Sequence, residues 1–234
     1  MSDRQDDVEF GVRGVIAGVG ESVPIAVSVF TYGITFGVLA RQASLSFPEA
    51  LLMSTTVFAA SAQFVVLDMW ESTLPIAAII VTTGMVNLRH VLMGASLQPW
   101  LQNLPRTKVW STLFFLNDES WGLTEQARAR GQRDAAFLLG SGLIVFVGWV
   151  SATAIGMTAG ALIADPARYG LDFAFVAVYI ALLVGVWDGR PDAVPLLVAA
   201  GVSVAAAFTL PGNWYIVLGG CIGSFAGVAR DSYG

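Results

Sequence analysis

The feature that most constrains this chain is a series of long runs without any charged residue. Ala193 to Ala229 contains no Asp, Glu, Lys or Arg over thirty-seven residues, and Ala136 to Ala164 contains none over twenty-nine. A helix needs about 20 apolar residues to cross the hydrocarbon of a bilayer. The chain is 56% hydrophobic and 12% charged, which is more apolar surface than one soluble domain of 234 residues can bury. We therefore predict an all-α integral membrane protein.

The uncharged runs predict about seven transmembrane helices and one re-entrant or broken helical hairpin. Basic residues favour the cytoplasm, and they lie on both sides of a short stretch within 106–133 that carries two carboxylates at its middle. A hairpin there keeps both basic loops inside and places the N-terminus outside. The alternative has eight full spans and the N-terminus inside. The predicted spans are 22–40, 50–67, 75–97, 136–164, 173–187 and the two helices into which a turn at 211–213 divides 193–229.

The domain organisation follows from the lack of any long polar block. We predict a single polytopic transmembrane domain over 1–234, with a short acidic segment at 1–13. This segment has the wrong sign for the start of a cleavable signal peptide, so we expect the first apolar segment to be retained. Cys221 is the one cysteine and is expected to be a packing residue. The composition indicates neither a nucleic-acid partner nor a cofactor.

Small residues predict where helices pack closely or bend. Gly33 and Gly37 lie four apart, as do Gly219 and Gly223, which predicts helix faces that allow close backbone approach. The small residues within 58–64 favour a bend in the second span.

Two polar clusters interrupt the apolar sequence, at 87–90 and at 117–119. An ionisable group inside a bilayer is costly and marks a pathway, a substrate site or a paired internal charge. Arg89 lies fourteen residues beyond Pro75, roughly 20 Å along a helix, past the bilayer centre, and snorkelling to the interface is the alternative. Gln63 brings an amide into the interior, where substrate contact and helix-to-helix hydrogen bonding are equally open.

These side chains suit a zwitterionic substrate. A substrate carboxylate in a dry site needs a cation or a helix N-terminus, and its ammonium needs an anion or carbonyl groups. A carboxylate that is desolvated without a partner binds a proton more readily, so transport could be proton-coupled. The alternative is that Arg89 pairs with Asp118 or Glu119 and only holds the fold. The predicted substrate-binding residues are Gln63, Asn87, Arg89, Asn117, Asp118 and Glu119, and those predicted for proton coupling are His90, Asp118 and Glu119.

Catalytic motifs are not found in the sequence. His90 is the only histidine, which excludes a His-rich metal centre, and no HExxH, Gly-x-Ser-x-Gly or Walker loop occurs. We therefore expect neither an enzyme nor a metal site. Two rivals to a transporter stay open: an ion or small-solute channel, which would pass a fast current, and an intramembrane enzyme, which would lose all activity in a His90→Ala variant.

Four stretches, strongest in their match over residues 22 to 130, carry a resemblance to a known family. They are Phe30 to Ala40, Met53 to Phe64, Val86 to Leu97 and Asn117 to Glu119. In these stretches the chain resembles the AzlC family of branched-chain amino-acid permeases, although Ala60 stands where the family motif has a Gly. The resemblance implies an exporter of branched-chain and other apolar amino acids in the cytoplasmic membrane. It also implies a small hydrophobic AzlD-like partner subunit.

Overall fold

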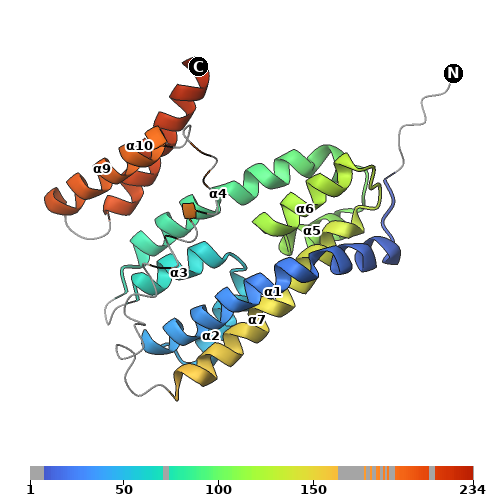
Figure 1. The fold of residues 1–234 in the computed structure, drawn as a ribbon, viewed down its shortest axis with the longest axis horizontal. Coiled ribbons are helices and arrows are strands. Elements are labelled where there is room, and N and C mark those ends of the chain that lie inside the picture. The colour runs from blue at the N-terminus through green and yellow to red at the C-terminus, as the bar shows by residue number, and fades with distance from the viewer. Residues whose placement is uncertain are drawn as a thin grey trace. The chain divides into compact units, whose positions relative to one another are not determined.

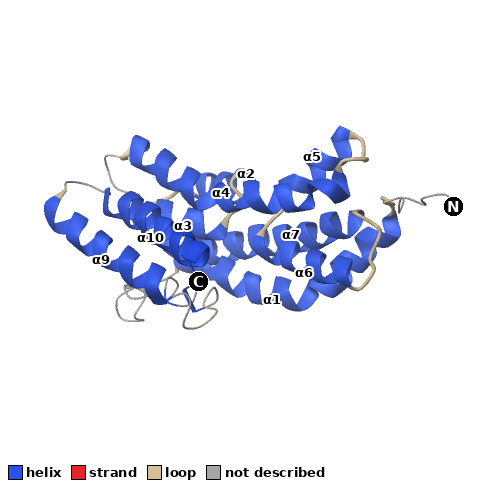
Figure 2. Ribbon diagram, turned by 90° about the horizontal axis from the view of Figure 1, so that it is seen from above, coloured by secondary structure: helices blue, strands red, loops and turns tan. Residues whose placement is uncertain are grey.

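A computed structural model describes residues 8–70, 74–162, 193–210 and 214–233, with scattered positions between 177 and 189. Every regular element in these residues is a helix, and one isolated bridge joins Glu9 to Asp134 (Figure 2). The all-α prediction is therefore confirmed for the described chain. The helices are α1 (Val12–Gln42), α2 (Phe47–Thr56), α3 (Ala60–Asp68), α4 (Ile76–Leu101), α5 (Arg106–Phe114), α6 (Asp118–Ala129), α7 (Ala136–Gly160), α9 (Ala193–Thr209) and α10 (Trp214–Tyr233).

The chain divides into two compact units. One comprises Met1–Gln63 and Leu88–Tyr169, and the other comprises Phe64–Asn87 and Gly170–Gly234. The single-domain organisation stays a prediction. The predicted turn at 211–213 and most of the predicted span at 173–187 lie outside the described residues.

Helices α1 and α7 lie side by side in the first unit and run in the same direction (Figure 1). Val15 lies against Gly140 near the start of both helices, and Gly37 lies against Gly156 towards their ends. A methyl group at Gly37 or Gly156 would overlap the backbone of the opposite helix. Since Gly33 also lies against α7, the close-packed face predicted at Gly33 and Gly37 is confirmed. Small residues thus bring two backbones into contact along most of their length.

One carboxylate holds the starts of both helices. Asp134, which is 8% exposed, accepts hydrogen bonds from the backbone N–H groups of Gly11 at 3.0 Å and Gly14 at 2.9 Å. It also accepts one from Ala136 at 3.0 Å. The first N–H groups of a helix have no partner within the helix, and an anion there also meets the positive end of the helix dipole. Asp134 therefore fixes the register in which α1 and α7 begin.

The parallel arrangement constrains the path of the chain. Three described helices are long and apolar enough to cross a membrane, namely α1, α4 and α7, so the count of about seven spans is not confirmed. If α1 and α7 both cross in the same direction, an odd number of crossings must separate them. With one re-entrant hairpin at 106–133, only the predicted spans 50–67 and 75–97 cross between α1 and α7, which is an even number. The predicted single re-entrant hairpin therefore does not fit this packing. The eight-span alternative does fit it.

Helix α4 carries the first polar cluster at its middle. The helix continues to Leu101, beyond the predicted end of the span at 97. Pro99 lies in its last turn, where a missing N–H removes a single hydrogen bond. Arg89 consequently lies thirteen residues from Ile76 and twelve from Leu101, which is the middle of the helix. Part of the core of the first unit packs around the C-terminal half of α4, and it comprises Met93, Leu97, Trp100, Leu101, Leu116, Ala135 and Leu138.

Helices α9 and α10 pair within the second unit. Gly219 lies against Ser203, and Gly223 lies against Ala199, so the two helices run antiparallel. The glycine face predicted for the last helix is therefore confirmed as a packing face.

Candidate functional site

The second predicted span is interrupted, as its small residues indicated. Helix α2 ends at Thr56 and α3 begins at Ala60, so Val57 to Ala59 form a first interruption. The amide of Gln63 spans it: Nε2 donates to the carbonyl oxygens of Val57 and Met53. The amide thus adds a second donor to two carbonyl groups that also accept from the backbone N–H groups of Val57 and Ala59.

The other end of the Gln63 amide faces α7. Trp149 Nε1 donates to Gln63 Oε1 at 3.2 Å, and Ser54 Oγ donates to the same oxygen at 3.4 Å. Ser54 also lies 3.0 Å from the Thr153 hydroxyl. Gln63 is 1% exposed. Of the two roles open to Gln63 from sequence, this geometry favours helix-to-helix hydrogen bonding.

A second interruption, Phe115 to Asn117, separates α5 from α6. Asn117 caps α6, because its Oδ1 accepts from Ser120 N–H at 2.7 Å while Ser120 Oγ accepts from Asn117 N–H at 3.0 Å. Gly142 of α7 lies so close to the Phe115 carbonyl group that no side chain fits between them. The stretch predicted to be a re-entrant or broken helical hairpin therefore consists of two helices with a short interruption between them.

Arg89 joins the two interruptions. Its guanidinium pairs with Asp118 Oδ2 at 3.0 Å and donates to the Ser61 hydroxyl. Ser61 lies in the first turn of α3, directly after the first interruption, and Asp118 is the first residue of α6, directly after the second. The side chains of Arg89 and Asp118 are 36% and 47% exposed, so neither is buried within the chain.

The two helix starts that meet Arg89 differ in charge. A helix start carries partial positive charge and unpaired backbone N–H groups. Helix α6 offsets this charge with Asp118 and Glu119, whereas the first turn of α3 contains no acidic residue. Arg89 and the start of α3 together therefore form a positive region, and the start of α6 forms a negative one a few ångströms away.

The remaining predicted residues lie close by in sequence but do not all join the pair. Asn117 is 6% exposed, and its Nδ2 has no hydrogen-bond partner among the described residues. Glu119 is half-buried in the first turn of α6. Asn87 and His90 are half-buried on α4, on either side of Arg89. The geometry thus brings together Arg89, Asp118 and, through the cap, Asn117.

The sequence reasoning missed the aromatic residues at the interruptions. Phe58 and Phe115 each lie in an interruption, and both rings pack on Phe146 of α7 with centroids 5.2 Å apart. The available signal was spacing, because each of these residues stands three positions before a residue that contacts Arg89, namely Ser61 or Asp118.

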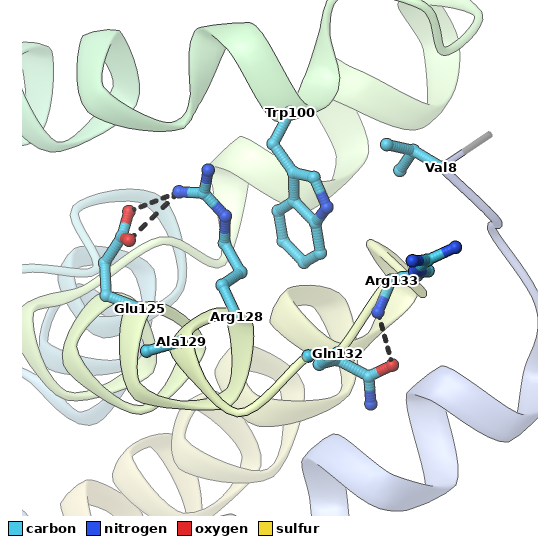
Figure 3. Close-up of a pocket in the computed structure, with 8 residues that line it drawn as sticks. Val8, Trp100, Glu125, Arg128, Ala129, Gln132 and Arg133 are labelled. Carbon is cyan, nitrogen blue, oxygen red and sulfur yellow. Dashed lines mark hydrogen bonds and ion pairs between the residues drawn. The ribbon is translucent and has the colours of Figure 1, made fainter. Parts of the chain in front are cut away.

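A separate open pocket of about 490 Å³ lies at the other end of α6. Figure 3 shows Arg128 between Glu125 and Trp100. Arg128 forms an ion pair of 2.8 Å with Glu125, and its guanidinium carbon lies 5.2 Å from the centroid of the Trp100 ring. Glu125 lies seven residues beyond Asp118, roughly 10 Å along the helix. The pocket therefore does not belong to the Arg89–Asp118 site.

Comparison with known proteins finds one matching family model and several similar membrane proteins. The family model described as AzlC protein matches residues 24–163. A membrane protein of Archaeoglobus fulgidus is 33% identical over 82% of this chain and 84% of its own length. The branched-chain amino acid transport protein AzlC of Bacillus subtilis is 27% identical over 84% of this chain and 77% of its own length. The inner membrane protein YgaZ of Escherichia coli is 28% identical over 86% and 83%. No solved structure matches the chain.

Proposed function

Because this chain belongs to the AzlC family, we propose that it is a secondary transporter that exports branched-chain and other apolar amino acids across the cytoplasmic membrane. The observation that carries the proposal is the contact of Arg89 with the starts of two interrupted helices. Discontinuous helices whose ends point into the membrane form the substrate sites of many transporters. An apolar amino acid needs paired charges at one end only, and an apolar wall at the other.

Arg89 pairs with Asp118 in the structure, and we propose that the substrate replaces each partner. In our proposal the substrate carboxylate binds Arg89 and the N–H groups at the start of α3, while the ammonium group binds Asp118. Each charge then exchanges one ionic partner for another, which avoids the several kcal/mol that a desolvated unpaired charge costs. Gln63 has a positioning role in this scheme, because it holds the first interruption in shape.

Proton coupling and a partner subunit complete the proposal. We propose that transport is proton-coupled and that Asp118 or Glu119, which follow one another in the first turn of α6, takes part in the coupling. We propose that His90, the residue after Arg89 on α4, takes part in this proton movement. We further propose that export requires a small AzlD-like subunit, as the family resemblance implies.

We also propose eight crossings with the N-terminus inside. The parallel packing of α1 and α7 supports this arrangement, and so does the basic sequence at 128–133, which then lies in the cytoplasm beside the start of α1. A reporter fused after Asn103 tests it, since 102–105 is external with eight spans and internal with one re-entrant hairpin. Alkaline phosphatase should be active at that position, and an active cytoplasmic reporter there would contradict the arrangement.

Leucine efflux from cells preloaded with a leucine dipeptide tests the function. Cells expressing the chain with its small partner should release leucine faster than cells with an empty vector. Asp118→Asn and Arg89→Gln should abolish the difference. Glu125→Gln is the matched control, because Glu125 forms an ion pair on the same helix outside the site. Efflux equal to the empty vector would reject the substrate class, and efflux that is independent of the proton gradient would reject the coupling.

A further inference from the structure

Three phenylalanine rings fill the space where the two interruptions approach α7. The Phe58 and Phe146 rings meet edge to face at 82°, and the Phe115 and Phe146 rings meet at 81°. Phe114 joins the group, with its ring centroid 5.0 Å from that of Phe115. Edge-to-face contacts at such distances are favourable and orient the rings. The aromatic group therefore has a defined shape rather than being a loose apolar lining.

The backbone around the rings is fixed by contacts already described. The carbonyl group of Phe115 lies against Gly142 of α7. Phe58 follows Val57, whose carbonyl group accepts a hydrogen bond from the Gln63 amide. Phe146 lies on α7 itself, which packs against α1 along its length. All three rings are nevertheless half-exposed. Rings that are held in place yet exposed present a surface to a ligand.

The rings lie next to the charged pair. Phe58 precedes Ser61 by three residues, and Phe115 precedes Asp118 by three, so at most about 11 Å of backbone separates the members of each pair. Arg89 contacts both Ser61 and Asp118. A ligand whose charged end lies at Arg89 and Asp118 therefore has its other end within reach of these rings.

We propose that Phe58, Phe115 and Phe146 form the wall that receives the side chain of the substrate, and that they set its maximum size. This inference rests on the proposed function, because it concerns the same site. The phenyl group of Phe146 lies between the other two, so it limits depth, while Phe58 and Phe115 limit width. In this proposal the wall favours branched aliphatic side chains and excludes substrates with aromatic side chains.

Competition in the efflux assay tests the size limit. Cells are loaded with dipeptides that release leucine and phenylalanine together, and the ratio of the two efflux rates is measured for wild type, Phe146→Ala, Phe115→Leu and Phe58→Leu. One methylene group in an apolar pocket changes discrimination by about tenfold or more, so Phe146→Ala should raise the phenylalanine-to-leucine ratio by at least about tenfold. The two leucine variants should raise it less. Phe208→Ala, which alters an 88% exposed ring on α9, is the matched control and should leave the ratio unchanged.

The outcomes separate this inference from the proposed function. If wild type exports neither amino acid, the proposed function fails. If wild type exports leucine and the ratio is unchanged in every ring variant that reaches the membrane, the wall is wrong while the exporter stands. Should Phe146→Ala fail to reach the membrane, the leucine variants decide the question, because they keep an apolar side chain of similar reach at each position.

Discussion

The two interruptions are both short breaks between consecutive helices, but the polar groups that complete them differ in charge and exposure. The first, Val57 to Ala59, is spanned by the neutral amide of Gln63, which is 1% exposed and hydrogen-bonded at both ends. The second, Phe115 to Asn117, is capped from within its own helix and leaves a carboxylate that is 47% exposed. A buried satisfied polar group specifies the fold, whereas an exposed charged pair remains available for exchange with a ligand. Arg89 is the residue that contacts the helices beyond both.

The largest expected effect on stability comes from removing the Gln63 amide that spans the first interruption. Gln63→Leu removes the hydrogen bonds that join the amide to the Val57 carbonyl and to the Trp149 indole N–H, and each such hydrogen bond contributes about 0.5–1.5 kcal/mol. We expect the variant to unfold at a clearly lower temperature in detergent, by tryptophan fluorescence. Gln102→Leu, at an exposed position on the loop after α4, is the control and should melt as wild type does. Equal unfolding temperatures of Gln63→Leu and wild type would show that the Gln63 amide does not stabilise the first interruption.

The next effect concerns the backbone contact that holds the second interruption. Gly142→Ala places a methyl group on the Phe115 carbonyl oxygen, and overpacking of this kind costs about 1–3 kcal/mol. Gly122→Ala on α6 has open space at its Cβ and should be neutral or slightly stabilising. Comparing the two midpoints of thermal unfolding measures the contact. If both variants melt together, α7 does not support the interruption.

A smaller change in stability is expected for the charged pair itself. A half-exposed ion pair contributes about 0–1 kcal/mol, so Asp118→Asn, Arg89→Gln and the double variant should melt close to wild type. Leucine efflux should nevertheless be lost in each. A melting loss as large as that of Gln63→Leu would indicate that the pair holds the fold, the alternative that the sequence left open.

The smallest expected effect concerns the cap at the start of α2, the helix that precedes the first interruption. The Ser46 hydroxyl and backbone N–H both donate to Glu49, and these hydrogen bonds hold the pKa of Glu49 below its ordinary value of 4.5. The stabilisation is present above that ordinary value and is lost as pH falls through the lowered pKa. Hydrogen exchange in the first turn of α2 should therefore rise in acid. Glu49→Gln should abolish this pH dependence, and an unchanged dependence in that variant would contradict the assignment.

Much of this fold could be predicted from sequence because it follows from local pattern. The small residues at 58–64 indicated the bend, and the glycine pairs indicated the packing faces. Charge patterning alone placed the hairpin, and it gave a path that the parallel packing of α1 and α7 does not fit. Direction depends on how many segments cross, which is a property of the whole chain.

The site was predicted only in part for a similar reason. Arg89 and Asp118 are conspicuous because charges are rare in apolar sequence. Gln63 was identified, but its role depends on Trp149, which lies 86 residues away. An Asp just before an apolar run is a usual capping residue. That Asp134 caps α1 as well as α7 was nevertheless missed, because Gly11 and Gly14 are more than a hundred residues away.

The most direct test of the central claim is equilibrium binding of three ligands to the purified protein. Leucine carries both charges, leucinol lacks the carboxylate, and 4-methylpentanoate lacks the ammonium group. Wild type should bind leucine best. Arg89→Gln should bind leucine and leucinol equally, and Asp118→Asn should bind leucine and 4-methylpentanoate equally. If both variants keep the full preference of wild type for leucine over each analogue, the Arg89–Asp118 pair does not bind the substrate.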